Sequence, residues 1–518
     1  MTRSRFYRRS KQKLSQTLPI KPVPANRLKL VFGILCVGLI GLMGRSAWLQ
    51  ILQAPLLEAR ARSFQIEKNS PLGIRRSVID RRGRLIALDE KQFRLWAHPR
   101  YFNFPGDPSG KIRKPNEVAE KLSKIIAIST EELTSMLDRR ISGVKLAEGI
   151  SSEKAQEIKR LQISGLDLEA YAQRLYPQQD LFANVIGFLD HDRVPQAGLE
   201  QSLNHQFHRK ETAHSLRRGA DGTPLPDELG PGVFHSDDKE IRLTLDLRLQ
   251  KVALNALKSQ VKEWDAKKGV AIVMDSSNGE ILALASTPSY NPNKYWEYSP
   301  GLFREWSVQD LFEPGSVFKP INLALALEEG VILPKGSVYD SGVVNVGGWP
   351  LKNWNHKANG LIDYAKVLQV SSNVGMVKIM RNLHPSTYWT WLHRLGIDQT
   401  PKTDLPGAIG GHLKSKELFV TQPIHGAVTA FGQGFSITPL KLVQLHALIA
   451  NGGRLVTPHI TNGFGEDKNI GAKNGSDKRQ LFRPEVTRTV LEWMESVVDK
   501  GSGMGVRTEN YRIGGKTG

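Results

Sequence analysis

The segment Phe312-Glu313-Pro314-Gly315-Ser316-Val317-Phe318-Lys319-Pro320 decides how the second half of this 518-residue chain is understood. A serine directly after Pro-Gly is expected at the start of a helix, where the helix dipole favours negative charge on a developing oxyanion. Lys319 follows Ser316 by about one helical turn, so its amine can approach the serine hydroxyl. Lysine can take that proton only when burial or neighbouring cations lower its pKa. We therefore predict a nucleophilic serine with a lysine base.

The pattern Ser-x-x-Lys is weak evidence by itself, because it recurs in charged stretches that are typical of solvated surfaces. The other occurrences begin at Ser10, Ser142, Ser151, Ser236 and Ser259. A second pattern, Ser-x-Asn, occurs at Ser371-Ser372-Asn373 inside the apolar stretch from Val370 to Met376. Buried polar groups need partners, and we expect Lys319 and a substrate amide to supply them.

The third element is Lys516-Thr517-Gly518, a motif that occurs once. We expect it on a strand, where small residues let the backbone of a ligand lie along the edge. A lysine and a hydroxyl group at that edge can bind a carboxylate. The three motifs follow one another in this order, with starts 55 and 145 residues apart. The ordered triplet is much more specific than any of its parts, and it is typical of serine β-lactamases and penicillin-binding proteins, usually with Asp in the middle of the second motif.

The composition is that of a globular protein with 40% hydrophobic and 24% charged residues, and its length suggests two to four folded units. The formal net charge is +20. No nucleic-acid-binding signature accompanies this charge, so we predict no nucleic-acid partner. The single cysteine, Cys36, excludes a disulfide framework within the chain. No metal-ligand spacing is present, and we expect neither a metal nor a cofactor.

The N-terminal region predicts one membrane anchor. Leu30 to Gly44 is apolar without a break, and we extend the anchor to residues 30–52 because about 20 residues are needed to span a bilayer. The first 29 residues carry nine basic and no acidic side chains, which predicts a cytoplasmic N-terminus and an exported bulk. Ala59-Arg60-Ala61 matches a small-x-small cleavage pattern, but it lies far beyond the apolar core. We therefore favour an uncleaved anchor over a signal peptide.

Two further domains are expected after the anchor. Residues 64–239 form a mixed, β-rich region with two strands around an Arg-Gly turn at 77–88, a helix capped by Ser129, and a second helix from about Ser152 to Leu161. Residues 240–518 form the second domain. Its expected elements are a helix near Leu247–Trp264 with an apolar face, a hairpin over 269–286, and a helix that begins at Thr438-Pro439 and ends at Gly452. The predicted apolar face of the first helix comprises Leu249, Val252, Ala253 and Ala256.

Beyond the three motifs, the chain resembles the class B penicillin-binding proteins, and within them the FtsI-type division transpeptidases. The further matching residues are Asp80-Arg81-x-Gly83, Arg174-x-Tyr176-Pro177, Gly198-Leu199-Glu200, Thr244-x-Asp246, Leu249-Gln250, Ser289-Tyr290-Asn291-Pro292, Phe431-Gly432-Gln433-Gly434 and Thr438-Pro439-Leu440. The resemblance implies a non-catalytic pedestal domain of the dimerisation type at 64–239. It also implies an α/β (α+β) penicillin-recognising transpeptidase domain at 240–518, with an antiparallel sheet flanked by helices.

The resemblance also implies a role for each motif residue. Ser316 attacks the penultimate D-Ala carbonyl of a stem pentapeptide, Lys319 is the base, and Ser371 relays the proton to the leaving amine. The substrate-binding residues are Asn373 for the amide, and Lys516, Thr517 and Gly518 for the terminal carboxylate. A neighbouring stem amine then forms the cross-link, and β-lactams trap the serine. The implied partners are an FtsW-type glycosyltransferase and other division proteins at a septum.

One departure from the family pattern concerns the end of the sequence. In the family the residue after Lys-Thr-Gly supplies the second oxyanion donor, and losing one such donor costs about 10²–10³ in rate. We therefore expect the sequence to be a piece of a longer protein. Three alternatives stay open at this stage: an elongation-type transpeptidase, a β-lactam sensor, and a non-catalytic division scaffold. A β-lactamase would need a deacylating water that the sequence does not reveal.

Overall fold

The computed structural model describes residues 25–54, 57, 66–68, 74–102, 114–140, 142–208, 215–217, 239–464 and 479–518. These residues fall into two compact units. One unit spans residues 1–70 and 212–235, and the other spans residues 71–211 and 236–518. The Ala59-Arg60-Ala61 pattern lies outside the described residues.

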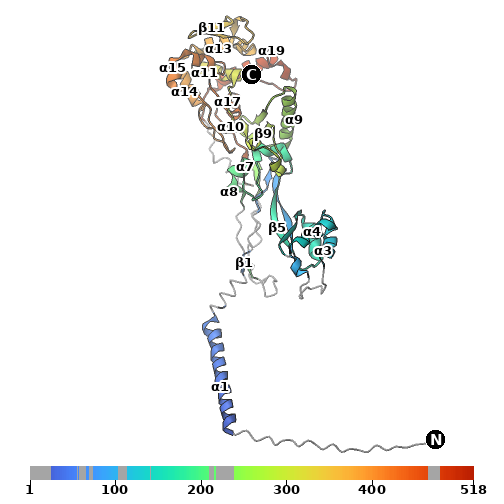
Figure 1. The fold of residues 1–518 in the computed structure, drawn as a ribbon. Helices are drawn as coiled ribbons and strands as arrows, with labels where there is room; N and C mark the ends of the chain where they lie inside the picture. The colour runs from blue at the N-terminus through green and yellow to red at the C-terminus, as the bar shows by residue number, and fades with distance from the viewer. Residues whose placement is uncertain are drawn as a thin grey trace, which may run out of the picture. The chain divides into compact units, whose positions relative to one another are not determined.

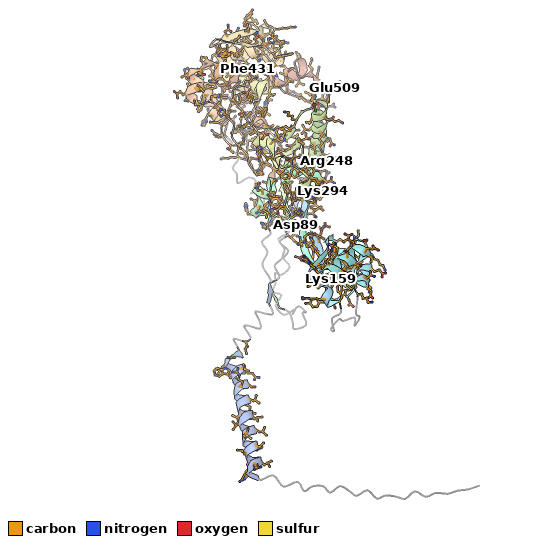
Figure 2. All side chains as sticks on the ribbon, in the orientation of Figure 1. Asp89, Lys159, Arg248, Lys294, Phe431 and Glu509 are labelled. Carbon is orange, nitrogen blue, oxygen red and sulfur yellow. The ribbon has the colours of Figure 1, made fainter. Side chains whose placement is uncertain are left out.

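The first unit contains helix α1 (Ala25–Ala47), which continues into the π-helical turn η1 (Trp48–Leu52). Residues Asn26–Leu52 are long and apolar enough to cross a membrane, with a mean hydropathy of 1.9. The side chains of α1 project outward all round, as Figure 2 shows, and none of this segment is buried. The single apolar helix expected from the sequence is therefore present. The unit also holds a short antiparallel pair, β1 (Ile66–Lys68) and β6 (Ser215–Arg217).

The second unit begins with a sheet whose longest strand, β3, pairs with three others. One of them, β5, is labelled in Figure 1. The strand order is β14-β7-β2-β3-β4, with β5 also paired to β3. The β2–β7 pair is parallel and the others are antiparallel. The strands are β2 (Val78–Ile79), β3 (Leu85–Ala97), β4 (Val144–Ile150), β5 (Leu166–Leu175), β7 (Ile241–Leu243) and β14 (Thr461–Phe464).

Three helices cover the far end of this sheet and close a small apolar core around Leu95, Leu122 and Leu133. They are α3 (Pro115–Ser123), α4 (Thr130–Arg139) and α5 (Ser152–Arg160). The predicted cap of α4 is confirmed, because Ser129 Oγ accepts a hydrogen bond from Glu132 N at 3.2 Å. Such a cap satisfies one of the amide groups that a helix start leaves without an intrahelical partner.

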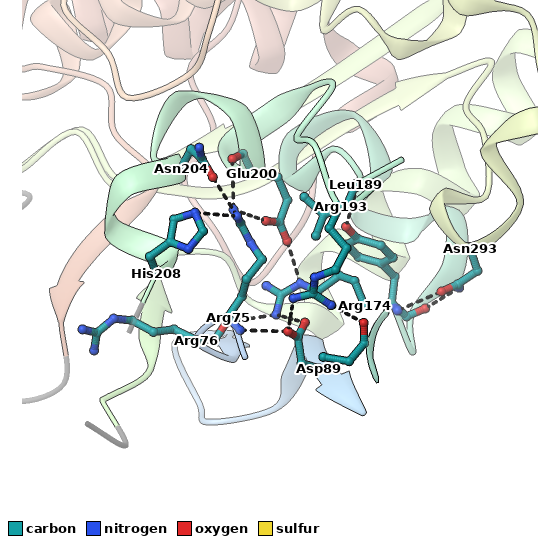
Figure 3. Close-up of polar contacts among 12 residues, drawn as sticks. Arg75, Arg76, Asp89, Arg174, Leu189, Arg193, Glu200, Asn204, His208 and Asn293 are labelled. Atoms are coloured by element: carbon teal, nitrogen blue, oxygen red, sulfur yellow. Dashed lines mark hydrogen bonds and ion pairs between the residues drawn. The ribbon is translucent and has the colours of Figure 1, made fainter. Parts of the chain in front are cut away.

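A buried cluster of charged side chains joins β3 and β5 of this sheet to the helix that follows them (Figure 3). Glu200 accepts from Arg174 Nε at 2.7 Å and pairs with Arg75 Nη2 at 2.8 Å, and all three side chains are at most 3% exposed. Asp89 pairs with Arg174 at 3.2 Å and with Arg193 at 2.6 Å. Removing one partner of such a buried pair leaves an uncompensated charge, so the members depend on one another. Glu200 lies on α7 (Gly198–Ser202), between α6 (Ala183–Ile186) and α8 (Asn204–Phe207).

Several of the other matching motifs, outside Ser-x-x-Lys, Ser-x-Asn and Lys-Thr-Gly, join the N-terminal half of this unit to the C-terminal half. Tyr176 N and O exchange hydrogen bonds of 2.9 Å with the side-chain amide of Asn293, on η5 (Pro292–Glu297). Asp80 Oδ2 accepts from Leu247 N at 3.2 Å, and Arg82 pairs with Asp246 at 2.7 Å. The motifs at 80–83, 174–177 and 244–246 thus hold the two halves together.

The C-terminal half is a mixed α/β body, which confirms the expected fold class. Its hairpin of β8 (Gly269–Met274) and β9 (Ile281–Thr287) lies where the sequence predicted it, and α9 (Leu247–Glu263) packs on β9. The predicted apolar face of α9 is wrong: Leu249 is 42% and Val252 is 67% exposed, whereas Gln250 and Leu254 are buried. Gln250 is buried because its side-chain amide exchanges hydrogen bonds of 2.7 and 2.8 Å with the backbone of Leu284.

Helix α11 (Lys319–Glu328) is the most deeply buried part of the C-terminal half, because its residues from Lys319 to Leu327 are all buried. The predicted cap of α17 is confirmed, because Thr438 Oγ1 accepts from Lys441 N at 3.2 Å, and Gly452 follows the helix with a φ of +81°. The principal helices are α11 (Lys319–Glu328), α12 (Tyr364–Gln369), α13 (Asn373–Met380), α14 (Pro385–Arg394), α15 (Lys416–Thr421), α16 (Pro423–Thr429), α17 (Pro439–Ala450) and α19 (Pro484–Lys500). Two small antiparallel pairs, β10 (Ser337–Asp340) with β13 (Gly360–Asp363) and β11 (Val343–Val346) with β12 (Trp349–Lys352), complete this part.

Candidate active site

Ser316 lies in the single turn η7 (Gly315–Phe318), which leads directly into α11. Pro320 suits the first turn of α11, because its missing N–H would have no intrahelical partner there. The turn is held from the other side by Gly432: Gly315 N donates to Gly432 O at 2.8 Å. A Cβ atom on Gly432 would lie 1.9 Å from Gly315 O, so only glycine fits this contact. The predicted placement of the serine at a helix start is therefore present.

Lys319 is fully buried and lies against the second motif. Its Nζ is 2.7 Å from Ser371 O, 2.8 Å from Asn373 Oδ1 and 3.2 Å from Ser371 Oγ. Ser371 adopts a left-handed backbone with a φ of +56°, which is uncommon for a residue with a side chain. The structure thus brings Lys319, Ser371 and Asn373 together. Ser316 Oγ makes no hydrogen bond to the described residues, and in unliganded active sites such contacts are often formed only with substrate.

The electrostatics around Lys319 favour a neutral amine. Burial lowers the pKa of Lys319 well below its ordinary value, because a charge is poorly solvated there. The positive charge of Lys516 lowers this pKa further, whereas the negative charge of Asp340 opposes the shift. Burial also lowers the pKa of Lys516, to about 8. The lowered pKa makes the neutral form of Lys319, which has a free lone pair, easier to reach than in a solvated lysine.

The third motif, Lys516-Thr517-Gly518, lies beside the turn that carries Ser316. It is not on a strand, so the expectation of a strand at this motif is wrong. Gly515 N donates to Met494 O on α19 at 3.1 Å, and no strand pairs with residues 511–518 among the described residues. A strand is assigned only where a neighbouring strand takes up its backbone groups. A Cβ atom on Gly518 would lie 3.2 Å from Val317 Cγ1, which places the motif against the serine turn.

The polar groups of the third motif are mutually bonded in this structure. Lys516 Nζ donates to Thr517 O at 2.6 Å and lies 3.3 Å from Thr517 Oγ1. Thr517 Oγ1 is also 2.6 Å from Ser502 Oγ. The ammonium group and the two hydroxyl groups form one donor cluster, which is suited to an anionic carboxylate.

Sequence reasoning missed several residues that build the site. Asp340 and Asn353 hold the second motif: Asp340 accepts from the side chain of Ser372, at Oγ, at 2.7 Å, and Asn353 Oδ1 accepts from the backbone of Asn373, at N, at 2.9 Å. His446 Nε2 lies 2.9 Å from Val317 O, behind the serine turn. Burial lowers the pKa of His446, so the neutral ring donates to that carbonyl. No local pattern marks these residues, because each acts on a segment far away in the sequence.

Comparisons with known proteins agree with this geometry. The family described as "Penicillin binding protein transpeptidase domain" matches residues 269–518, and the family described as "Penicillin-binding Protein dimerisation domain" matches residues 72–218. A protein of Mesostigma viride named "Peptidoglycan D,D-transpeptidase FtsI homolog" is 33% identical over 516 residues, which cover 95% of this chain and 85% of that protein. A protein of the same name from Chlorokybus atmophyticus is 34% identical, covering 85% of this chain and 65% of that protein.

The solved structures add a fold-level likeness. The crystal structure of a putative peptidoglycan glycosyltransferase from Atopobium parvulum superposes with a TM-score of 0.60 at 20% identity, covering 86% of this chain and 82% of that one. At this identity the likeness concerns the fold alone. The two matched domains and the identity to the Mesostigma protein show that this chain belongs to the class B penicillin-binding proteins, the family of FtsI-type peptidoglycan D,D-transpeptidases.

Proposed function

We propose that this protein cross-links peptidoglycan through a covalent acyl-enzyme on Ser316. One observation carries the proposal: a buried lysine at the start of α11, one turn after Ser316, contacts both polar side chains of Ser371-x-Asn373. This contact joins two of the three motifs around one amine of lowered pKa. It supports the assignment of Lys319 as base and Ser371 as proton relay for the nucleophile Ser316.

The hydrogen bonds of Lys319 suggest how its lone pair is aimed. A neutral amine has two N–H groups and one lone pair. The two carbonyl oxygens, Ser371 O at 2.7 Å and Asn373 Oδ1 at 2.8 Å, take the two N–H groups. The lone pair is then left for a hydroxyl group. Ser371 Oγ lies 3.2 Å away, and we propose that Ser316 Oγ turns towards the amine when substrate binds. This is the protonation pattern that a general base requires.

The reaction follows as two acyl transfers. Ser316 Oγ forms a bond to the carbonyl carbon of the penultimate D-Ala while its proton passes to Lys319, and the bond to the terminal D-Ala nitrogen breaks. Ser371 passes the proton to that leaving amine. The amine of a neighbouring stem then attacks the ester, forms the cross-link amide, and Ser316 regains its proton. β-Lactams present a similar acyl group and carboxylate, so we propose that they trap Ser316.

Substrate binding is assigned to the other motif residues. Asn373 binds the stem amide, because its side chain lies beside the reacting groups. Lys516, Thr517 and Gly518 take the terminal carboxylate. Displacing the present contacts between Lys516 and Thr517 frees an ammonium group and a hydroxyl group for it.

Mass spectrometry of the penicillin-treated natural protein tests the proposal. We expect one adduct, on the peptide that contains Ser316, and no adduct in Ser316→Ala. Ser307→Ala is a matched control, because Ser307 is buried in the same half of the chain but belongs to none of the three motifs. An adduct on any residue other than Ser316 would overturn the mechanism.

We further propose a location and a set of partners. Nine basic residues before Leu30 favour a cytoplasmic N-terminus and an uncleaved single-pass anchor in the plasma membrane. The likeness to FtsI-type proteins favours the division septum and an FtsW-type glycosyltransferase partner that contacts the pedestal, residues 64–239. N-terminal sequencing of the membrane-extracted protein tests the anchor, and a mature start near Arg62 would contradict it.

A further inference from the structure

Asp340 is a buried carboxylate whose hydrogen-bond partners are all neutral groups. It ends β10 and is fully buried, and no ion pair reaches it from the described residues. Its oxygens accept from Gly342 N at 2.8 Å, Asn353 Nδ2 at 2.8 and 2.9 Å, Asn359 Nδ2 at 2.5 Å and Ser372 Oγ at 2.7 Å. Burying a charge is costly unless every lone pair is used, and here neutral donors use them. So specific a cage indicates a role beyond packing.

The first link from this cage to the active site is Asn353, which is 2% exposed and follows β12. Its Nδ2 is fixed by Asp340 and by Lys357 O at 2.9 Å. These bonds orient Oδ1, which accepts from Asn373 N at 2.9 Å and Val374 N at 3.1 Å. Asn353 therefore caps the N-terminus of α13 from a distant segment, at Asn373, the residue that contacts Lys319.

The second link is Ser372, the middle residue of the second motif. Its hydroxyl group donates to Asp340 and accepts from Gly375 N at 2.8 Å, so it caps α13 from inside the chain. The adjacent Ser371 has a φ of +56°, a conformation that the surrounding structure must impose. Asp340 thus holds Ser372 directly and holds Asn373 through Asn353.

We propose that Asp340 is a positioning residue: through Ser372 and Asn353 it locks Ser371-Ser372-Asn373 in the geometry that contacts Lys319. The inference rests on the proposed function, since it takes Lys319 as the base and Ser371 as the relay. Asp340 itself touches neither substrate nor the reacting atoms. Its contribution is to restrict the conformations of the segment Ser371-Ser372-Asn373, because catalysis by orientation requires fixed reacting groups.

The charge of Asp340 gives the proposal a readout that a merely structural role would not move. Burial raises the pKa of Asp340, but hydrogen bonds from Asn359, Ser372, Gly342 N and Asn353 outweigh this and leave it below its ordinary value. The carboxylate is therefore charged at neutral pH. The charged groups that act on Lys319 are Lys516, which lowers its pKa, and Asp340, which raises it.

The experiment measures the acylation rate of the full-length natural protein by a labelled penicillin as a function of pH. Asp340→Asn keeps the shape of the side chain, but its NH₂ group faces donors that need an acceptor, so the second motif should lose its fixed position. We therefore expect the acylation rate to fall about 10- to 100-fold. Loss of the negative charge lowers the pKa of Lys319, so the acidic limb of the profile should move to lower pH. Asn353→Ala should slow acylation to a similar degree without this shift, because it removes no charge.

Controls separate positioning from folding. Asn345→Ala, an exposed asparagine on β11 whose side chain makes no hydrogen bond to the described residues, should leave rate and profile unchanged. Melting temperatures identify folded variants. If Asp340→Asn does not fold, Asn359→Ala decides, because Asn359 is only half-buried and its side chain bonds to Asp340; we expect a several-fold slower acylation.

The outcomes separate this inference from the proposed function. Absence of a Ser316 adduct in the unmutated protein would refute the proposed function. A normal adduct in the unmutated protein, with Asp340→Asn folded and unchanged in both rate and acidic limb, would overturn the positioning role alone. If Asn359→Ala decides the matter, an unchanged rate would overturn it in the same way.

Discussion

Replacing Gly432 by alanine should slow the acylation of Ser316 strongly while the protein still folds, because this glycine supports the turn that carries Ser316. Its φ is +85°, and an alanine in the left-handed region costs roughly 1–2 kcal/mol. In addition, the new Cβ atom would lie 1.9 Å from Gly315 O, inside any real contact distance. Relief requires a shift of about 1 Å in Gly315 or Gly432, and a misplacement of about 1 Å can cost about 10²-fold in rate.

Gly452 provides the matched control for this substitution. Its φ of +81° imposes the same backbone strain, but a Cβ atom there would meet nothing within 4 Å. Gly452→Ala should therefore lower the free energy of unfolding by about 1–2 kcal/mol in denaturant titration. Gly432→Ala should lower it by more, because the clash with Gly315 adds to the same backbone strain. Only Gly432→Ala should slow acylation of Ser316 by a labelled penicillin. Equal acylation rates in the two folded variants would refute the link between this contact and the serine turn.

Three further predictions concern charged groups. Lys319→Arg should abolish covalent penicillin labelling, because a guanidinium group stays protonated; labelling above background would contradict the lysine as base. Lys516→Met should move the acidic limb of the acylation profile to higher pH, because the charge of Lys516 lowers the pKa of Lys319; a limb that stays in place or moves to lower pH would contradict this effect of the Lys516 charge. Glu200→Gln should destabilise the protein by about 3–5 kcal/mol in denaturant titration, because Arg75 and Arg174 lose their shared buried carboxylate; a loss below about 1 kcal/mol would show that the cluster contributes little, on the same scale.

Local signals in the sequence were sufficient wherever a feature depends on neighbouring residues. The caps at Ser129 and Thr438 and the hairpin turn before Gly279 are set by side chains within three or four positions, and all three are present. The Pro-Gly pair before Ser316 likewise predicted this serine at the start of a helix, and the turn η7 leads directly into α11.

Features that depend on distant segments could not be predicted in this way. Gln250 on α9 is buried because the backbone of Leu284, 34 residues away, accepts and donates to its amide. Hydrophobic periodicity ranks glutamine as a surface residue, so it selected Leu249 and Val252 instead. The parallel pairing of β7 with β2 joins segments about 160 residues apart, and no periodicity in either one indicates it.

Lys516 and Asp340 shift the pKa of Lys319 in opposite directions. If Lys319 is the base, as we propose, the site nevertheless needs both residues. A base that works near neutral pH must be less basic than free lysine, and burial with a neighbouring cation provides this. The loop that carries Ser371 must also be rigid, and a carboxylate is the strongest small acceptor for fixing several donors at once. Placed against Lys319 without other partners, that carboxylate would bind the ammonium form and remove the base. Its neutral donors, from Asn353, Asn359 and Ser372, occupy its lone pairs instead. The cage thus allows a rigid loop and a neutral lysine in the same site.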